Sequence, residues 1–173
     1  TYAVDEDGVA SAPVSQRSNG QTPFGFSFTP RGALVVSEAF GGTPNASAVS
    51  SYSLRDGQLT VRSGSVSTTQ TAACWIVITK NGKFAYASNT GSNNISSYRV
   101  RSAGRLTLQE AVATPTGAGP IDMALNRNSR FLYVLNGGAH SIEAFQVNRA
   151  NGHLTQVTGV SGLPNGANGL VAR

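Results

Sequence analysis

Charge and sulfur are both scarce in this chain. Only 12% of its 173 residues are charged, and it contains one cysteine, one methionine and one tryptophan. Charged residues usually make up about a quarter of a chain, so this composition argues against a coiled coil or a charged disordered tail. The single cysteine, Cys74, excludes an internal disulfide and a cysteine-built zinc site. No apolar run approaches the roughly 18 residues of a membrane span, so no membrane partner is expected.

Short catalytic and nucleotide-binding motifs are missing as well. The sequence has no Gly-x-Ser-x-Gly elbow, no phosphate-binding loop and no His-Glu-x-x-His pair. We therefore expect no cofactor and no bound metal.

Glycine and proline, in contrast, are plentiful and evenly spread. The chain has 20 glycines and 7 prolines, and each would weaken a helix interior in which it fell. Long helices are disfavoured, and an all-β fold is predicted.

A pattern of four short strands recurs along the sequence. Three segments, which begin at Phe24, Cys74 and Ile121, each have a strand, a tight polar turn and a second strand. The turn residues are 50 and 47 residues apart, and another hairpin follows each turn; they are Gly32, Gly82 and Ser129. A four-stranded unit that recurs every 46 to 50 residues is typical of a β-propeller blade. A β-sandwich also has many short strands, but it does not need a fixed period.

The repeat begins and ends partway through a unit. Tyr2 aligns with Tyr52, so residues 1–22 are predicted to form the third and fourth strands of a partial blade. Three whole blades are expected at residues 23–72, 73–119 and 120–162, and residues 163–173 match only the first strand of a closing blade. The prediction is fifteen antiparallel strands, or about 3.7 blades. An open array leaves strand edges and blade faces in water, so the remaining half of the propeller is expected to come from the same precursor or from another chain.

These residues resemble the lactonase family of seven-bladed propellers, which includes 6-phosphogluconolactonase-like proteins and carboxymuconate cyclases. Residues 133–136 (Tyr-Val-Leu-Asn) and 86–89 (Tyr-Ala-Ser-Asn) stand where such repeats carry Tyr-Val-x-Asn. The resemblance implies a seven-bladed ring, of which this chain is the C-terminal half, and an activity on small lactones.

The resemblance also bears on the site. Lactonase relatives often place a histidine near the start of the first strand of a blade, and the matching residues here are Gly25, Trp75 and Asp122. Glu38 resembles the glutamate that follows the Tyr-Val-x motif in active relatives.

Antiparallel strand order sorts the charged residues onto two rims of the ring. The turns within the hairpins carry nine of the thirteen basic residues, namely Arg31, Arg55, Lys80, Lys83, Arg101, Arg105, Arg127, Arg130 and Arg149. We interpret this rim as a solvated basic face. No aromatic residues interleave with these cations, so no nucleic-acid partner is expected.

The opposite rim is the predicted site, because propeller ligands usually enter where loops from many blades converge. The predicted catalytic residues are Glu38, Asp122 and His140, which can transfer protons. The predicted substrate-binding residues are Trp75, Phe40, Asn89 and Asn136.

Structural roles are the alternative for several of these residues. Asp122 could cap a turn, Glu38 could stabilise the loop that follows it, and His140 could be an exposed surface residue. Trp75 could be wedged between blades. Two functions therefore stay open: opening or formation of a small lactone, with proton transfer by Glu38 and Asp122, and a non-catalytic scaffold that binds a protein or a carbohydrate.

Overall fold

Twelve strands form three four-stranded antiparallel sheets in the computed structural model, which describes residues 1–173. The first sheet contains β1 (Pro23–Phe28), β2 (Ala33–Glu38), β3 (Ala48–Arg55) and β4 (Gln58–Ser67). The middle sheet contains β5 (Ala73–Ile78), β6 (Phe84–Asn89), β7 (Asn94–Val100) and β8 (Leu106–Pro115). The third sheet contains β9 (Pro120–Leu125), β10 (Phe131–Asn136), β11 (Ser141–Val147) and β12 (Leu154–Ser161). Two short 3-10 helices, η1 (Phe40–Gly42) and η2 (Ser102–Gly104), lie in connections.

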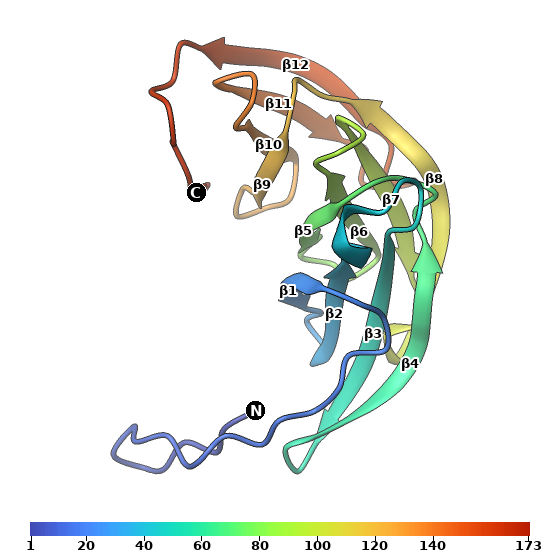
Figure 1. The fold of residues 1–173 in the computed structure, drawn as a ribbon, viewed down its shortest axis with the longest axis vertical. Coiled ribbons are helices and arrows are strands. Elements are labelled where there is room, and N and C mark those ends of the chain that lie inside the picture. The colour runs from blue at the N-terminus through green and yellow to red at the C-terminus, as the bar shows by residue number, and fades with distance from the viewer.

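The three sheets are arranged like the blades of a fan (Figure 1). Strands β1, β5 and β9 form the inner edge, where β5 contacts both of the others. Strands β4, β8 and β12 form the outer edge. This arrangement is a partial β-propeller, so the predicted fold class is confirmed and the alternative of a β-sandwich is wrong.

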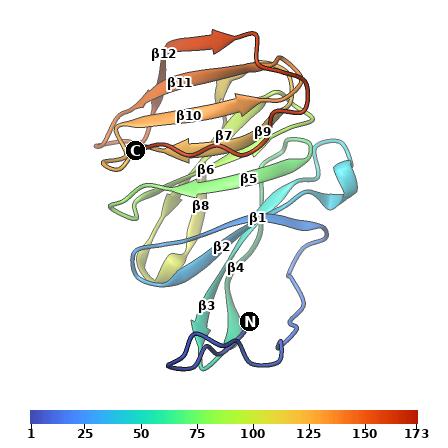
Figure 2. The same cartoon turned by 90° about the vertical axis from the view of Figure 1, so that its left-hand side faces the viewer.

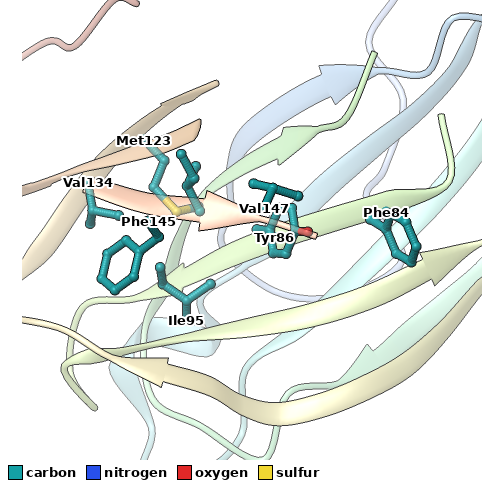
Figure 3. Packing of buried hydrophobic residues seen from close by; sticks show 8 residues of the cluster. Phe84, Tyr86, Ile95, Met123, Val134, Phe145 and Val147 are labelled. Atoms are coloured by element: carbon teal, nitrogen blue, oxygen red, sulfur yellow. The ribbon is translucent and has the colours of Figure 1, made fainter. Parts of the chain in front are cut away.

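Apolar side chains fill the two spaces between neighbouring sheets. The cluster between the middle and third sheets contains Phe84, Tyr86, Ile95, Met123, Leu132, Val134, Phe145 and Val147 (Figure 3). The cluster between the first and middle sheets contains Val35, Val49, Ile76, Ala85, Ala87, Tyr98 and Leu106. The middle sheet therefore buries both of its faces, and the first and third sheets each bury one face against it.

Polar contacts also join neighbouring sheets. The Ser37 hydroxyl donates to the Cys74 carbonyl at 3.0 Å, and the Tyr86 hydroxyl donates to the Gly152 carbonyl at 2.7 Å. The turn residue Ser129, with φ of 53°, accepts a hydrogen bond from the Lys80 amide at 2.9 Å. Glycine, which adopts a positive φ without strain, occupies this turn position in the other two blades. Ser129 has a positive φ at the same position, and its hydroxyl joins two sheets.

The chain ends differ from the prediction. Residues 1–22 contain only an isolated bridge between Val4 and Ala10, and residues 163–173 contain no strand. Twelve strands form instead of the predicted fifteen. A strand is stabilised by hydrogen bonds to a neighbour, and no strand of residues 1–173 pairs with either segment.

The twelve strands are joined only by turns and loops, apart from η1 and η2, which have three residues each. No helix in the structure reaches the length and hydrophobicity that a membrane crossing requires.

Candidate functional site

A hollow of about 540 Å³ lies on the inner wall of the fan, at the start of the innermost strands. It is lined by Phe24, Cys74, Trp75, Ile121, Asp122, Asn168 and Gly169. The first five residues come from β1, β5 and β9, and the last two come from the C-terminal segment, which runs along β9 (Figure 2).

A β-bulge at the start of each innermost strand shapes this hollow. The register between the first two strands of a blade shifts between Pro23 and Phe26, between Ala73 and Trp75, and between the partners of Leu135 and Asn136. A bulge places an extra residue in one strand and changes the direction in which nearby side chains point. The bulge segments supply Phe24, Cys74 and Ile121, so the same distortion in three blades brings equivalent positions to one surface.

Asp122 is the only carboxylate that lines the hollow. Its Oδ1 atom accepts a hydrogen bond from the Met123 amide at 2.7 Å, and its Oδ2 atom accepts one from the Leu170 amide at 2.8 Å. Loss of hydration raises the pKa of this carboxyl above its ordinary value, and the two amide hydrogen bonds offset part of the increase. Asp122 is therefore a carboxyl that is easier to protonate than an exposed aspartate.

The neighbours of Asp122 are apolar or uncharged. Trp75 is half-buried, packs against the cluster between the middle and third sheets, and presents part of its surface to the hollow. Burial raises the pKa of the Cys74 thiol; the Thr90 side chain offsets part of this increase and the Asp122 carboxylate adds to it. A thiol with a raised pKa is mostly protonated near neutral pH, so Cys74 is a poor nucleophile.

Glu38 lies apart from the hollow and is fully buried. Its Oε1 atom accepts hydrogen bonds from the Gly20 amide at 2.8 Å and the Ser18 hydroxyl at 3.3 Å. Its Oε2 atom accepts a hydrogen bond from the Ser65 hydroxyl at 2.7 Å. The carboxylate therefore joins β2, β4 and the segment before β1. A catalytic role for Glu38 stays a prediction.

Asn89 and Asn136 occupy the position of Glu38 in the other two blades and are also fully buried. The Asn89 amide donates to Asn94 Oδ1 and Ser96 Oγ at 2.8 Å each, and the Asn136 amide donates to Glu143 Oε2 at 2.9 Å. These contacts connect strands within a blade. Neither asparagine lines the hollow, and substrate binding by them stays a prediction.

Phe40 and His140 lie in the loops that connect the second and third strands of their blades. Both have positive φ angles, 48° for Phe40 and 49° for His140, and both are partly exposed. Neither lines the hollow. Of the seven predicted site residues, the structure thus brings Asp122 and Trp75 together there.

Four residues of the hollow, Phe24, Ile121, Asn168 and Gly169, were not predicted from the sequence, and Cys74 was predicted only to form no disulfide or zinc site. The repeat contained a signal for three of them, because Phe24, Cys74 and Ile121 begin the three aligned segments. Nothing in the repeat placed Asn168 and Gly169 beside β9. No group of three or more His, Cys, Asp or Glu side chains that could hold a metal ion lies together in the structure.

The family described as "Lactonase, 7-bladed beta-propeller" matches residues 45–167 of the chain. This match covers most of the chain and agrees with the three propeller blades. The chain belongs to this lactonase family of β-propellers. Comparison with curated protein sequences returns no match.

Solved structures share the fold at low sequence identity. A protein from Lactobacillus plantarum is 23% identical with a TM-score of 0.77, and the match covers 95% of this chain and 49% of that one. A 6-phosphogluconolactonase-like protein from Bacteroides uniformis is 20% identical with a TM-score of 0.73, over 92% of this chain and 47% of that one. A similar protein from Bacteroides fragilis is 21% identical with a TM-score of 0.70, over 82% and 40%. The chain thus spans about half the length of the structures that it matches.

Proposed function

We propose that the protein opens a small, uncharged lactone in the hollow on the inner wall, with Asp122 as the proton-transfer group. Membership of the lactonase family supports a lactonase-like function. The observation that carries the proposal is the position of Asp122, a carboxyl with a raised pKa in a hollow that Trp75 and Cys74 line with it. Perturbed carboxyls in open hollows mark sites of acid–base chemistry.

A single carboxylate can serve both proton transfers of lactone hydrolysis. Asp122 takes a proton from water while the water oxygen bonds to the lactone carbonyl carbon. The tetrahedral oxyanion then collapses, the bond from the carbonyl carbon to the ring oxygen breaks, and Asp122 returns the proton to that oxygen. The products are a carboxylic acid and an alcohol on one open chain.

The substrate class follows from the charge of the hollow. None of its seven lining residues is Lys or Arg, so this wall offers no cation to a phosphate or carboxylate substituent. Trp75 and Phe24 offer apolar surface to the carbon face of a ring. We therefore favour a neutral lactone over a phosphorylated one.

The test is lactone turnover by the complete protein carrying Asp122→Asn. Removing a general base should lower turnover by about 10²-fold or more, since general acid–base catalysis contributes that much. Asp56→Asn is the matched control, because Asp56 is exposed in the β3–β4 turn, and it should leave turnover unchanged. Full turnover by the Asp122→Asn protein would exclude this mechanism.

The pH profile of the same reaction gives a second measurement on Asp122. The carboxylate form is the base, so turnover should fall as pH falls through the pKa of this group. Because burial raises that pKa, the loss should begin at a higher pH than the value of about 3.9 for an exposed aspartate would give. A profile that stays flat down to pH 4 would contradict the assignment.

A non-catalytic scaffold is the second candidate. It is favoured by the isolation of Asp122, since no other carboxyl and no histidine lines the hollow. If the complete protein opens no lactone of any size, while Asp122→Asn leaves its stability unchanged, the scaffold function is preferred.

A further inference from the structure

A run of four connected hollows crosses the rim formed by the β1–β2, β3–β4, β5–β6, β7–β8, β9–β10 and β11–β12 turns, here called the turn rim. The first hollow contains Arg31, Arg55 and Arg62. The second contains Arg31 again, with Lys83 and Arg101. These two hollows share Arg31, Ala103 and Gly104 as lining residues, so they form one continuous depression between the first and middle sheets.

The run continues across the other two sheets. The third hollow shares Asn81 with the second and contains Lys80 and Arg149. The fourth shares Arg149 with the third and adds Arg130. The four hollows thus form a basic track over three blades that lacks any Asp or Glu among its lining residues.

The cations of this track have no acidic partners within the chain. The one ion pair in the structure joins His153 to Glu110 at 2.9 Å. Asp56 is the single carboxylate in the six turns of the rim, and it lines none of the four hollows. Unpaired cations in a row produce a positive potential that attracts an extended anion.

The other lining groups indicate which anion fits. The exposed side chains of Asn81, Ser102, Asn128 and Thr155 supply hydroxyl and amide groups that can bond to sugar hydroxyls. The only aromatic residue of the track is Phe84, which is 1% exposed and has Arg99 against its ring at 5.3 Å. Single-stranded nucleic acids are held by stacking of their bases on exposed aromatic side chains, and the track offers none.

We propose that the turn rim binds a linear acidic polysaccharide, with its carboxylates on the arginines and lysines of the basic track and its hydroxyls on the neighbouring Ser, Thr and Asn side chains. Arginine matches a carboxylate through two parallel hydrogen bonds, which favours uronic acid units. This binding surface lies on the opposite rim from the loops that connect successive blades, and it does not depend on lactone chemistry.

The experiment measures binding of polygalacturonate oligomers to the complete protein by isothermal titration calorimetry. Binding is expected at low salt, with an affinity that falls steeply as sodium chloride is added. Arg31→Gln, which changes the residue shared by two hollows, should weaken binding about tenfold. Arg17→Gln is the matched control, since Arg17 is an exposed arginine outside the track, and it should bind as the parent does.

Four results would overturn the proposal. They are no binding of polygalacturonate at low salt, equal loss of affinity in Arg17→Gln and Arg31→Gln, equal or tighter binding of single-stranded DNA or polyglutamate, and binding of an uncharged dextran. Arg31 makes no side-chain hydrogen bond and no ion pair, so its substitution should leave the thermal unfolding midpoint unchanged and keep the comparison valid.

Discussion

The carboxylates of Glu38 and Asp122 accept hydrogen bonds from different kinds of donor. Two backbone amides hold Asp122, and one of these belongs to the C-terminal segment. Glu38 is held by one amide and one hydroxyl from the segment before β1 and by one hydroxyl from β4. Asp122 faces a hollow, whereas the groups around Glu38 enclose it, and the two residues are therefore expected to respond differently to substitution.

Glu38→Ala should destabilise the protein. It leaves the donors of Gly20, Ser18 and Ser65 without their acceptor, at a cost of about 2–3 kcal/mol in the free energy of unfolding. Glu38→Gln keeps one oxygen for the Gly20 amide and should cost less than about 1 kcal/mol. Urea denaturation of both variants measures the difference. If Glu38→Gln keeps its stability but loses lactone turnover, Glu38 has a catalytic role and not only a structural one.

The sequence predicted the positions of individual residues only where the repeat aligned them with equivalent residues in other blades. The period of the repeat located Asp122 and Trp75 on the innermost strands, and both line the hollow. It could not show that β4 and the segment before β1 enclose Glu38, because the contacts to Ser18 and Ser65 join residues 20 and 27 positions away. The position of Asn168 and Gly169 beside β9 was equally inaccessible, since no pattern in the sequence specifies where an irregular segment lies.

At the scale of elements, the strands depend on close approach at a few glycines. A Cβ atom on Gly25 of β1 would lie 2.7 Å from the Cys74 carbonyl oxygen and 2.8 Å from the Trp75 Cα atom, both in β5. Backbone atoms cannot rotate away as a side chain can. The innermost strands of the first two blades are thus spaced for a residue without a side chain at this position.

Gly25→Ala should push β1 away from β5 and lower the free energy of unfolding by about 1–3 kcal/mol. Gly64→Ala is a suitable control in β4, because the nearest atoms to its Cβ, at 2.8 and 2.9 Å, belong to the end of the Asn19 side chain, which can move. Thermal unfolding of both variants tests the prediction. Equal losses would show that the spacing of β1 and β5 is not the limiting contact.

The element boundaries could be predicted well where the repeat was strong. Tight turns at Gly32, Gly82 and Ser129 separate the first two strands of each sheet, as the period indicated. The β-bulges were not predicted, because a bulge adds one residue within a strand and does not change the apolar pattern enough to be recognised. The hollow depends on these bulges, so its shape could not be derived from sequence.

At the scale of the whole molecule, the first sheet leaves an apolar face without a neighbour. Phe26 is 62% exposed, Phe28 is 49% exposed and Val61 is 47% exposed, and the two phenylalanine rings contact each other edge to face. A sheet face of this kind is normally covered by the next blade of a propeller. We propose that further blades, from the same precursor or from another chain, cover it and complete the ring.

The native particle should therefore be larger than this chain. Its solution mass, measured by light scattering after size-exclusion chromatography, should be at least about twice 17.9 kDa, because the matching structures are about twice as long. A monodisperse particle of 17.9 kDa, with Phe26 and Phe28 exposed, would contradict the proposed ring.

The position of the middle sheet has a consequence for the rates at which backbone hydrogens are replaced by deuterium. All six residues of β6 are buried, whereas most residues of β1 and β12 are open to water on at least one side. Opening β6 requires the loss of both clusters at once, so its amides should exchange only through global opening, while those of β12 exchange through local fraying. Mass spectrometry of deuterated peptides should therefore find slower labelling in peptides from β6 than in peptides from β12.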